Sequence, residues 1–366
     1  MDISPRRAAV TIACAIVAAA TGLHAAVSQA EPADGKLSTG TYSGAAGKLG
    51  YELYVPASYQ AGTPMPLVVA LHGCTQTAAA FRTLSRYDDV AAKNGFIVVY
   101  PEQPTSSNYM RCWNWFNNAH VNRAAGEPAL IAGITVQIQS QYLIDPKRVY
   151  VTGLSAGGAM SSVMVATYPD LYAAVGIGSG CEYTAGAACA GYKSDDPEKA
   201  GKRAYDAMGA FARPVPFIVF TGDQDKTVPP VNADQLVRAQ QVTADWADDG
   251  KQNGSVPRAA VKTVAGRASG GRSYTVKYYS DGHGHELGQL WVVKGMGHAW
   301  SGGNPAAQYA DAAGPDESTA MYDFFGTHPL GSPGPALGGG SRWPQWPPSG
   351  WPKPPKWPPG SGSKHS

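Results

Sequence analysis

The stretch Arg148-Val149-Tyr150-Val151-Thr152-Gly153-Leu154-Ser155-Ala156-Gly157 decides the fold of this 366-residue chain. Its first five residues are rich in Val and Tyr and indicate a buried strand, whereas residues 156–167, which are mostly small or apolar, indicate a helix. A Gly-x-Ser-x-Gly sequence between a strand and a helix predicts a nucleophile elbow, a sharp turn that exposes the serine. A side chain at either glycine would clash there, and the helix start directs free N–H groups at the reacting oxygen. We therefore expect Ser155 to be a nucleophile.

Alternating strands and helices extend outward from this segment over residues 49–329. Short apolar runs indicate buried strands at 51–55, 66–71, 96–100, 149–152, 173–177, 216–220 and 290–293. Helical stretches lie between them, at 83–93, 127–142, 156–167, 232–248 and 317–325. This alternation predicts one α/β catalytic domain with a mostly parallel sheet and helices on both of its faces.

The partners of Ser155 are expected after later strands, in the chain order serine, acid, histidine. Asp223 and Asp225 both follow the strand at 216–220. We expect Asp225 to be the acid because it lies deeper in the loop, and Asp223 to brace the turn. His298 follows the strand at 290–293 across a Gly-Met-Gly segment and is the expected base. His283 and His285 precede that strand, so they are expected at the opposite edge of the sheet, in solvent.

The oxyanion of an acyl-transfer intermediate needs two backbone N–H donors. One is expected from Ala156, the residue after the nucleophile, and the other from Cys74, in the loop after the strand at 66–71. Of the five cysteines, Cys14 lies in the apolar N-terminus and four remain. Three pairings are possible, and the short Cys181–Cys189 loop favours that pair and leaves Cys74 with Cys112. Neither the Cys nor the His spacing fits a zinc site, so no metal is expected.

The chain ends differ in composition from the middle. Residues 1–30 predict a signal peptide, because Arg6 and Arg7 precede an apolar run too short to span a bilayer and Ser28-Gln29-Ala30 offers a cleavage site. Residues 31–48 are expected to form a flexible leader. Residues 330–366, rich in Gly, Pro and Trp, predict a disordered tail. Alternatively, its four tryptophans adhere to an insoluble or carbohydrate surface.

The balance of charged residues argues against a nucleic acid as the binding partner. Lys and Arg number 29 against 27 Asp and Glu, which leaves a net charge of +2 and no basic stripe for nucleic acid. Charged residues make up 15% of the chain, while Gly (44) and Pro (29) are numerous, as in loop-rich secreted proteins. We expect export to the medium or the periplasm, without stable membrane association.

Several motifs together resemble the poly(3-hydroxybutyrate) depolymerase family of secreted esterases, to which feruloyl and acetylxylan esterases are related. The motifs are His72-Gly73-Cys74-Thr75-Gln76, Tyr100-Pro101-Glu102-Gln103, Cys112-Trp113-Asn114-Trp115-Phe116, residues 144–158 and Gly297-His298-Ala299-Trp300. The resemblance covers residues 35–328. It implies an α/β-hydrolase fold, Ser155 as nucleophile, Asp225 as acid, His298 as base and no cofactor. It also implies that Trp300, together with Trp113, lines the substrate pocket.

These features predict a secreted serine esterase that works through an acyl-enzyme. Poly(3-hydroxyalkanoate) or its oligomers are the first expected substrate. Feruloylated or acetylated plant polysaccharide is the alternative, and acyl transfer to an alcohol instead of water stays open. A hypothesis of another class is a non-catalytic surface-binding protein built on a hydrolase scaffold.

Overall fold

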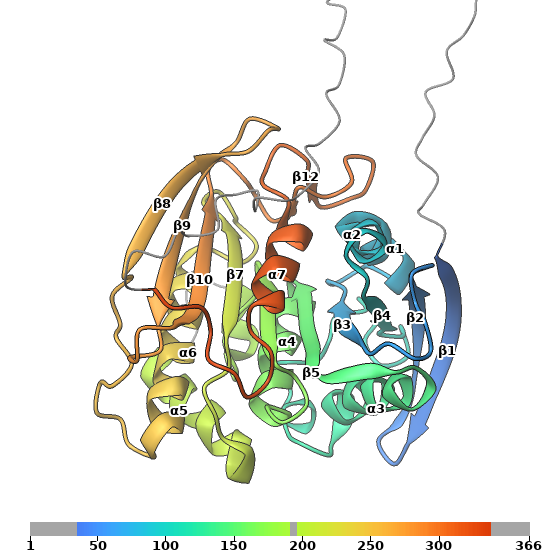
Figure 1. Ribbon diagram of the computed structural model, residues 1–366, viewed down its shortest axis with the longest axis horizontal. Coiled ribbons are helices and arrows are strands. Elements are labelled where there is room, and N and C mark those ends of the chain that lie inside the picture. The colour runs from blue at the N-terminus through green and yellow to red at the C-terminus, as the bar shows by residue number, and fades with distance from the viewer. Residues whose placement is uncertain (1–34, 191–195, 338–366) are drawn as a thin grey trace, which may run out of the picture. The chain divides into compact units, whose positions relative to one another are not determined.

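The computed structural model describes residues 35–190 and 196–337 (Figure 1). In these residues ten strands form one sheet in the order β1-β2-β4-β3-β5-β6-β7-β10-β9-β8. The strands are β1 (Lys36–Gly44), β2 (Gly47–Val55), β3 (Met65–Leu71), β4 (Ile97–Glu102), β5 (Ile144–Leu154), β6 (Ala174–Gly178), β7 (Phe217–Gly222), β8 (Lys262–Arg267), β9 (Ser273–Ser280) and β10 (Glu286–Val293). A two-stranded sheet of β11 (Trp300–Ser301) and β12 (Ala310–Asp311) follows.

The six central strands run parallel. β3 pairs with β4 and β5, and the parallel ladder continues through β6 and β7 to β10. At the two ends of the sheet, β1 and β2 and then β9 and β8 pair antiparallel. Because parallel strands end at the same edge, the loops after β3, β5, β7 and β10 meet there, and this edge is where open α/β sheets bind ligands.

Helices cover both faces of the sheet, as predicted (Figure 1). One face packs against α3, α4, α5 and α6, and the other against α1, α2 and α7. The helices are α1 (Ala78–Ser85), α2 (Tyr87–Asn94), α3 (Gly126–Gln141), α4 (Ala156–Thr167), α5 (Pro197–Met208), α6 (Val231–Asp249) and α7 (Glu317–Gly326), with short 3-10 turns at Asn118–His120, Gly186–Ala190 and Gly209–Phe211. Among the described residues, no helix has the length and apolar character needed to cross a bilayer.

β3 shows why this architecture follows from the sequence. Leu67, Val69 and Leu71 enter the core under α3 and α4, whereas Val68 and Ala70 enter the core under α1 and α7. All five side chains are fully buried. A strand covered on both faces needs apolar residues at every position, which gives a continuous apolar run rather than an alternating one.

The expected flexible leader at 31–48 is wrong for most of its length. Lys36–Gly44 forms β1, which pairs with β2 from Lys36 opposite Val55 to Gly44 opposite Gly47. The strand is polar because it lies at the sheet edge and exposes most of its side chains. β8, β9 and α5 were also not expected, and the helix expected at 83–93 is two helices separated at Arg86, whose φ is 58°.

The folded region also continues beyond residue 329. The Leu330 N–H donates to the Lys147 carbonyl at 2.8 Å, and the Glu286 N–H donates to the Pro335 carbonyl at 2.8 Å. The first part of the expected tail therefore packs against the starts of β5 and β10. The signal peptide predicted at 1–30 and the tail from residue 338 onward lie outside the described residues.

Candidate active site

Ser155 occupies a strained turn between β5 and α4. Its φ and ψ are 57° and −119°, a conformation that residues with a side chain rarely adopt. The Ser155 N–H donates to the Gly178 carbonyl at 2.8 Å, which anchors the turn to β6. A Cβ at Gly157 would lie 2.6 Å from the His72 carbonyl oxygen and against that of Leu71. The turn therefore closes only because residue 157 is glycine.

Asp225 and His298 form a buried pair at the same edge. The His298 Nδ1 lies 2.8 Å from Asp225 Oδ2, and the carboxylate has no exposed surface. The other oxygen, Oδ1, accepts the N–H groups of Thr227 and Val228 at 2.8 and 2.9 Å. Burial raises the pKa of Asp225, but the His298 interaction and these N–H groups outweigh burial and hold the pKa below its usual value. The carboxylate is thus ionised and oriented toward the imidazole.

Asp223 has a different set of partners in the same loop. Its Oδ1 accepts the Gly295 N–H at 2.7 Å, and its Oδ2 lies 3.2 Å from Lys294 Nζ. Both partners belong to the loop between β10 and His298. The structure therefore pairs Asp225, and not Asp223, with the histidine, while Asp223 ties the two loops together.

The loop after β3 approaches the nucleophile closely. A Cβ built at Gly73 would lie 3.4 Å from Ser155 Cβ and 3.3 Å from the Leu154 carbonyl oxygen. Cys74 follows in this loop, and Ala156 is the first residue of α4. Within the described residues, neither the Cys74 N–H nor the Ala156 N–H donates to a backbone carbonyl. Neither of the two expected oxyanion donors is therefore used in a backbone hydrogen bond, and their role stays a prediction.

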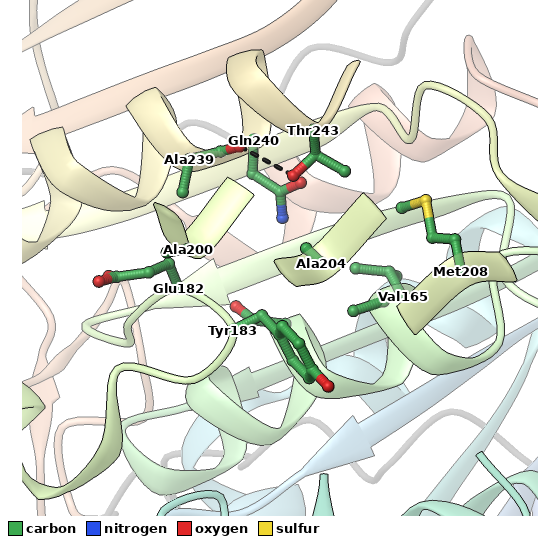
Figure 2. Close-up of a pocket in the computed structure, with 11 residues that line it drawn as sticks. Val165, Glu182, Tyr183, Ala200, Ala204, Met208, Ala239, Gln240 and Thr243 are labelled. Carbon is green, nitrogen blue, oxygen red and sulfur yellow. Dashed lines mark hydrogen bonds between the residues drawn. The ribbon is translucent and has the colours of Figure 1, made fainter. Parts of the chain in front are cut away.

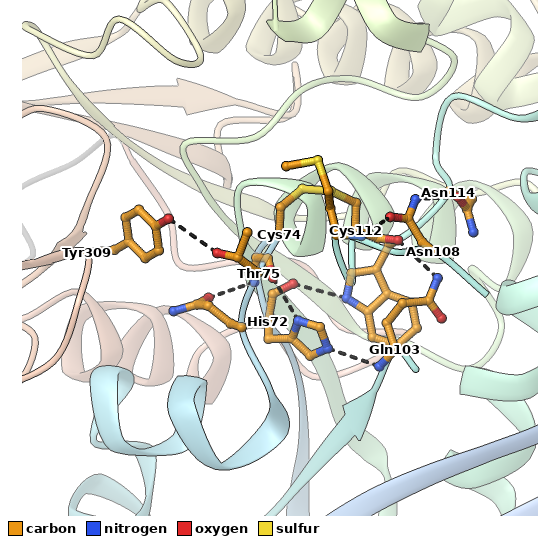
Figure 3. Close-up of a disulfide and its surroundings, with 12 residues drawn as sticks. His72, Cys74, Thr75, Gln103, Asn108, Cys112, Asn114 and Tyr309 are labelled. Atoms are coloured by element: carbon orange, nitrogen blue, oxygen red, sulfur yellow. Dashed lines mark hydrogen bonds between the residues drawn. A yellow bond between two sulfur atoms is a disulfide. The ribbon is translucent and has the colours of Figure 1, made fainter. Parts of the chain in front are cut away.

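Tyr309 links the histidine loop to this segment. Its hydroxyl is 3.3 Å from Thr75 Oγ1 (Figure 3), and its ring centroid is 6.5 Å from that of His298. Tyr309 therefore connects the His298 ring to the loop that carries Cys74 and Thr75. Sequence reasoning missed Tyr309, because an isolated loop tyrosine carries no pattern that reveals its neighbours.

The two predicted disulfides, Cys74–Cys112 and Cys181–Cys189, are present. The first joins the loop after β3 to the segment after β4 (Figure 3). The Thr75 N–H also donates to the Met110 carbonyl at 2.6 Å, so the same two segments are joined twice.

The prediction that Trp300 and Trp113 line the substrate pocket is wrong. Trp300 is 1% exposed and Trp113 is fully buried. The Trp113 indole N–H donates to the His72 carbonyl at 3.0 Å. The Trp300 indole N–H donates to Ser318 Oγ at 3.0 Å, and that hydroxyl donates to the Ser85 carbonyl. Adjacency to a site residue does not fix the direction of a side chain, and both indoles point into the core beneath the site.

A small pocket lies between α4, α5 and α6 (Figure 2). Apolar side chains such as Val165, Ala204 and Met208 line it, together with Glu182 and Gln240. Its lining contains none of the residues predicted for catalysis. In residues 35–190 and 196–337, no group of three or more His, Cys, Asp or Glu side chains has an arrangement that could hold a metal ion.

Comparison with known proteins places the chain among esterases. The family model described as "Esterase PHB depolymerase" matches residues 49–251. Poly(3-hydroxyalkanoate) depolymerase C of Paucimonas lemoignei is 35% identical over 253 residues, which are 67% of this chain and 57% of that protein. Probable acetylxylan esterase A of Aspergillus fumigatus is 36% identical over 194 residues, which are 49% of this chain and 51% of that protein. The chain thus spans about half the length of the curated relatives it matches.

The solved structures agree on the architecture. The acetyl xylan esterase from Aspergillus awamori has a TM-score of 0.61 and 27% identity, and the match covers 72% of this chain and 94% of that one. The sheet order and the two helical layers are those of an α/β-hydrolase. Since the family model covers more than half of the sequence, the chain belongs to the esterase family of poly(3-hydroxybutyrate) depolymerases.

Proposed function

We propose that this protein is a secreted serine esterase that cleaves ester bonds through an acyl-enzyme. The observation that carries the proposal is the buried Asp225–His298 pair, 2.8 Å apart, at the sheet edge where Ser155 occupies its strained turn. An acid that orients a histidine which can take the proton of a nearby serine is the arrangement that activates a serine hydroxyl. Family membership gives independent support for ester chemistry.

In the proposed mechanism, Ser155 Oγ attacks the ester carbonyl while His298 Nε2 takes its proton. Asp225 accepts the His298 Nδ1–H, which keeps Nε2 available as the base. The Cys74 and Ala156 N–H groups donate to the tetrahedral oxyanion. His298 then protonates the departing alcohol and activates the water that hydrolyses the acyl-enzyme. The structure has no hydrogen bond between the Ser155 hydroxyl and His298 in its described residues, and this contact is one that substrate binding often tightens.

Poly(3-hydroxyalkanoate) or its oligomers are the proposed substrates. The relative from Paucimonas lemoignei is named for this polymer and matches over two thirds of the chain. Export fits the apolar N-terminus, which follows Arg6 and Arg7, and the two disulfides, which persist in oxidising compartments.

Acetylated polysaccharide is the second candidate substrate. Two kinds of comparison favour it: the acetylxylan esterase of Aspergillus fumigatus and the solved acetyl xylan esterase of Aspergillus awamori. Both substrates require the same ester chemistry at Ser155, so the choice between them concerns only what the site accepts.

The deciding experiment measures 3-hydroxybutyrate released from an amorphous poly(3-hydroxybutyrate) suspension by the wild type and by Ser155→Ala. Ser140→Ala, at an exposed serine on α3, serves as the control. We expect release from the wild type and the control, and a loss of about 10⁴-fold or more in Ser155→Ala. Near-full turnover of a short p-nitrophenyl ester by Ser155→Ala would contradict the esterase assignment. Cleavage of that ester and of acetylxylan, without hydrolysis of the polymer, would favour acetylated polysaccharide as the substrate.

A further inference from the structure

The His72 imidazole is buried directly beneath the loop that carries Cys74. Its Nε2 lies 3.0 Å from the backbone N of Gln103, and its Nδ1 lies 2.8 Å from the Gly73 carbonyl oxygen (Figure 3). Because a backbone N–H can only donate, Nε2 is the acceptor of the first hydrogen bond. Burial lowers the pKa of His72 to about 4, so the ring is neutral at ordinary pH. The single ring hydrogen is therefore on Nδ1, which donates to the Gly73 carbonyl.

The hydrogen bond from His72 Nδ1 to the Gly73 carbonyl fixes the orientation of the whole Gly73–Cys74 peptide unit. The Gly73 C=O and the Cys74 N–H belong to one planar peptide unit and point in opposite directions. Any rotation that moves the carbonyl away from His72 also turns the Cys74 N–H away from its present direction. Glycine has unusual backbone freedom, so this peptide has little intrinsic preference of its own. The hydrogen bond from the His72 imidazole therefore determines the orientation of this peptide.

Neighbouring groups in the turn are held in the same way. The Gly73 N–H donates to Gln76 Oε1 at 2.8 Å, and the Trp113 indole N–H donates to the His72 carbonyl. Gln103, the partner of Nε2, is itself fixed by its side-chain amide. That amide donates to the Cys112 carbonyl at 3.0 Å and to the buried carboxylate of Glu127. The imidazole thus connects a rigid buried network to the one peptide that carries the Cys74 donor.

We propose that His72 is a positioning residue for ester hydrolysis, because its Nδ1–H holds the Gly73–Cys74 peptide so that the Cys74 N–H faces the oxyanion formed at Ser155. The inference rests on the proposed function of Ser155. It assigns His72 no contact with the substrate and no proton transfer. Its effect falls on the transition state, where the oxyanion exists, and much less on the ground-state ester.

Two substitutions separate the two hydrogen bonds of the ring. In His72→Asn, the side-chain amide reaches the level of Nδ1 and can still donate to the Gly73 carbonyl, but the acceptor for Gln103 is lost. In His72→Gln, the amide reaches the level of Nε2 and can accept from Gln103, but the donor to Gly73 is lost. Each variant removes one contact of the same buried ring, so each is the matched control of the other.

We expect kcat on a short p-nitrophenyl ester to fall about 10²-fold in His72→Gln, the scale of losing one oxyanion donor, and clearly less in His72→Asn. KM should change little in either variant. The inhibition constant of a trifluoromethyl ketone, which forms an oxyanion on the serine, should rise in parallel with the loss in kcat/KM. Melting temperatures of both variants report their folding.

Equal kcat losses in the two variants, or losses that follow only the melting temperatures, would overturn the positioning role and leave the esterase proposal intact. A wild type without Ser155-dependent turnover would instead refute the proposed function and this inference together. A measurement on the wild type covers the case in which neither variant folds. Nitrogen-15 NMR of the imidazole should show the Nδ1–H form of His72, and the Nε2–H form would contradict the proposal.

Discussion

Asp223 and Asp225 lie in one loop after β7, yet their carboxylates have different partners. Asp225 Oδ2 contacts the His298 ring, whereas Asp223 contacts the backbone of Gly295 and the Lys294 ammonium. The difference arises because the residues of a turn point in different directions, and of these two side chains only that of Asp225 points toward the imidazole. The role of an acidic residue here depends on its partner rather than on its charge.

Replacing these two aspartates by asparagine should give contrasting results. Asp225→Asn should lower kcat by about 10³- to 10⁴-fold, because the neutral amide no longer holds the productive histidine tautomer. Asp223→Asn should keep kcat within about tenfold and lower the free energy of unfolding by about 1 kcal/mol, because it weakens a hydrogen bond to Gly295. Ester turnover and denaturant unfolding of both variants check this. A larger loss of kcat in Asp223→Asn than in Asp225→Asn would identify Asp223 as the catalytic acid.

A buried carboxyl at the start of β10 predicts a pH-dependent stability. Burial raises the pKa of Glu286 to about 7, from an ordinary value of 4.5. The unfolded chain therefore loses this proton at a lower pH than the folded chain, and the resulting stability is lost as the pH rises from 4.5 to about 7. Glu286→Gln has no proton to lose and can still accept the hydrogen bond from Gln289.

We therefore expect the melting temperature of Glu286→Gln, relative to the wild type, to increase over that pH window and to stay constant above it. Differential scanning calorimetry at several pH values measures this difference. A difference that does not vary with pH would show that Glu286 ionises in the fold as it does in water.

At the scale of elements, the sequence predicts the buried strands well and the sheet ends poorly. β3, β5 and β7 are covered on both faces and appear as continuous apolar runs, so their position could be read directly. β1 and β8 have one side open to solvent and carry polar residues, which hides them among loops. α5 buries Ala200, Gly201, Ala204 and Met208, and most of its other residues are charged or polar, so no run of large apolar residues reveals it.

The same distinction applies to the candidate site. Ser155, Asp225 and His298 could be selected because each follows a recognisable strand, and the sheet brings strand ends together. The inward direction of Trp113 and Trp300 could not be predicted, because it depends on partners such as Ser318 that are distant in the sequence. The link between Tyr309 and Thr75 is hidden for the same reason.

The elbow between β5 and α4 should fail when its glycine is changed. In Gly157→Ala, the new methyl group would lie against the Leu71 and His72 carbonyl oxygens. We expect the free energy of unfolding to fall by about 3 kcal/mol or more, because backbone atoms cannot move aside without disturbing β3. Gly326→Ala at the end of α7 is the control, since a Cβ there would meet no atom within 4 Å. Similar unfolding curves for both variants would contradict the close packing of the elbow.

At the scale of the whole molecule, the candidate catalytic residues lie at one edge of the central sheet, and the C-terminal segment packs at the other. The edge after β3, β5, β7 and β10 carries Ser155, Asp225 and His298. At the start of β5 and β10, the C-terminal segment returns to the sheet. There Leu330 binds the Lys147 carbonyl, and the buried His328 lies between the Phe324 and Glu286 carbonyls. One edge thus holds the candidate chemistry, and the other is closed by the last described residues.

The contacts of α7 have a consequence for the order in which the molecule matures. Ser318, near the start of this helix, joins the Trp300 indole to the Ser85 carbonyl, so the segment after His298 is completed by a contact between residues 233 positions apart in the sequence. Contacts between such distant segments form late, because the chain entropy lost in closing long loops must be offset first. During refolding, the first strands and α4 can therefore assemble while the molecule is still inactive. If the proposed esterase activity holds, the recovery of ester hydrolysis during refolding should follow the docking of α7. A chain that stops before residue 317 would contain Ser155, Asp225 and His298, but the segment after His298 would lack its contact with Ser318.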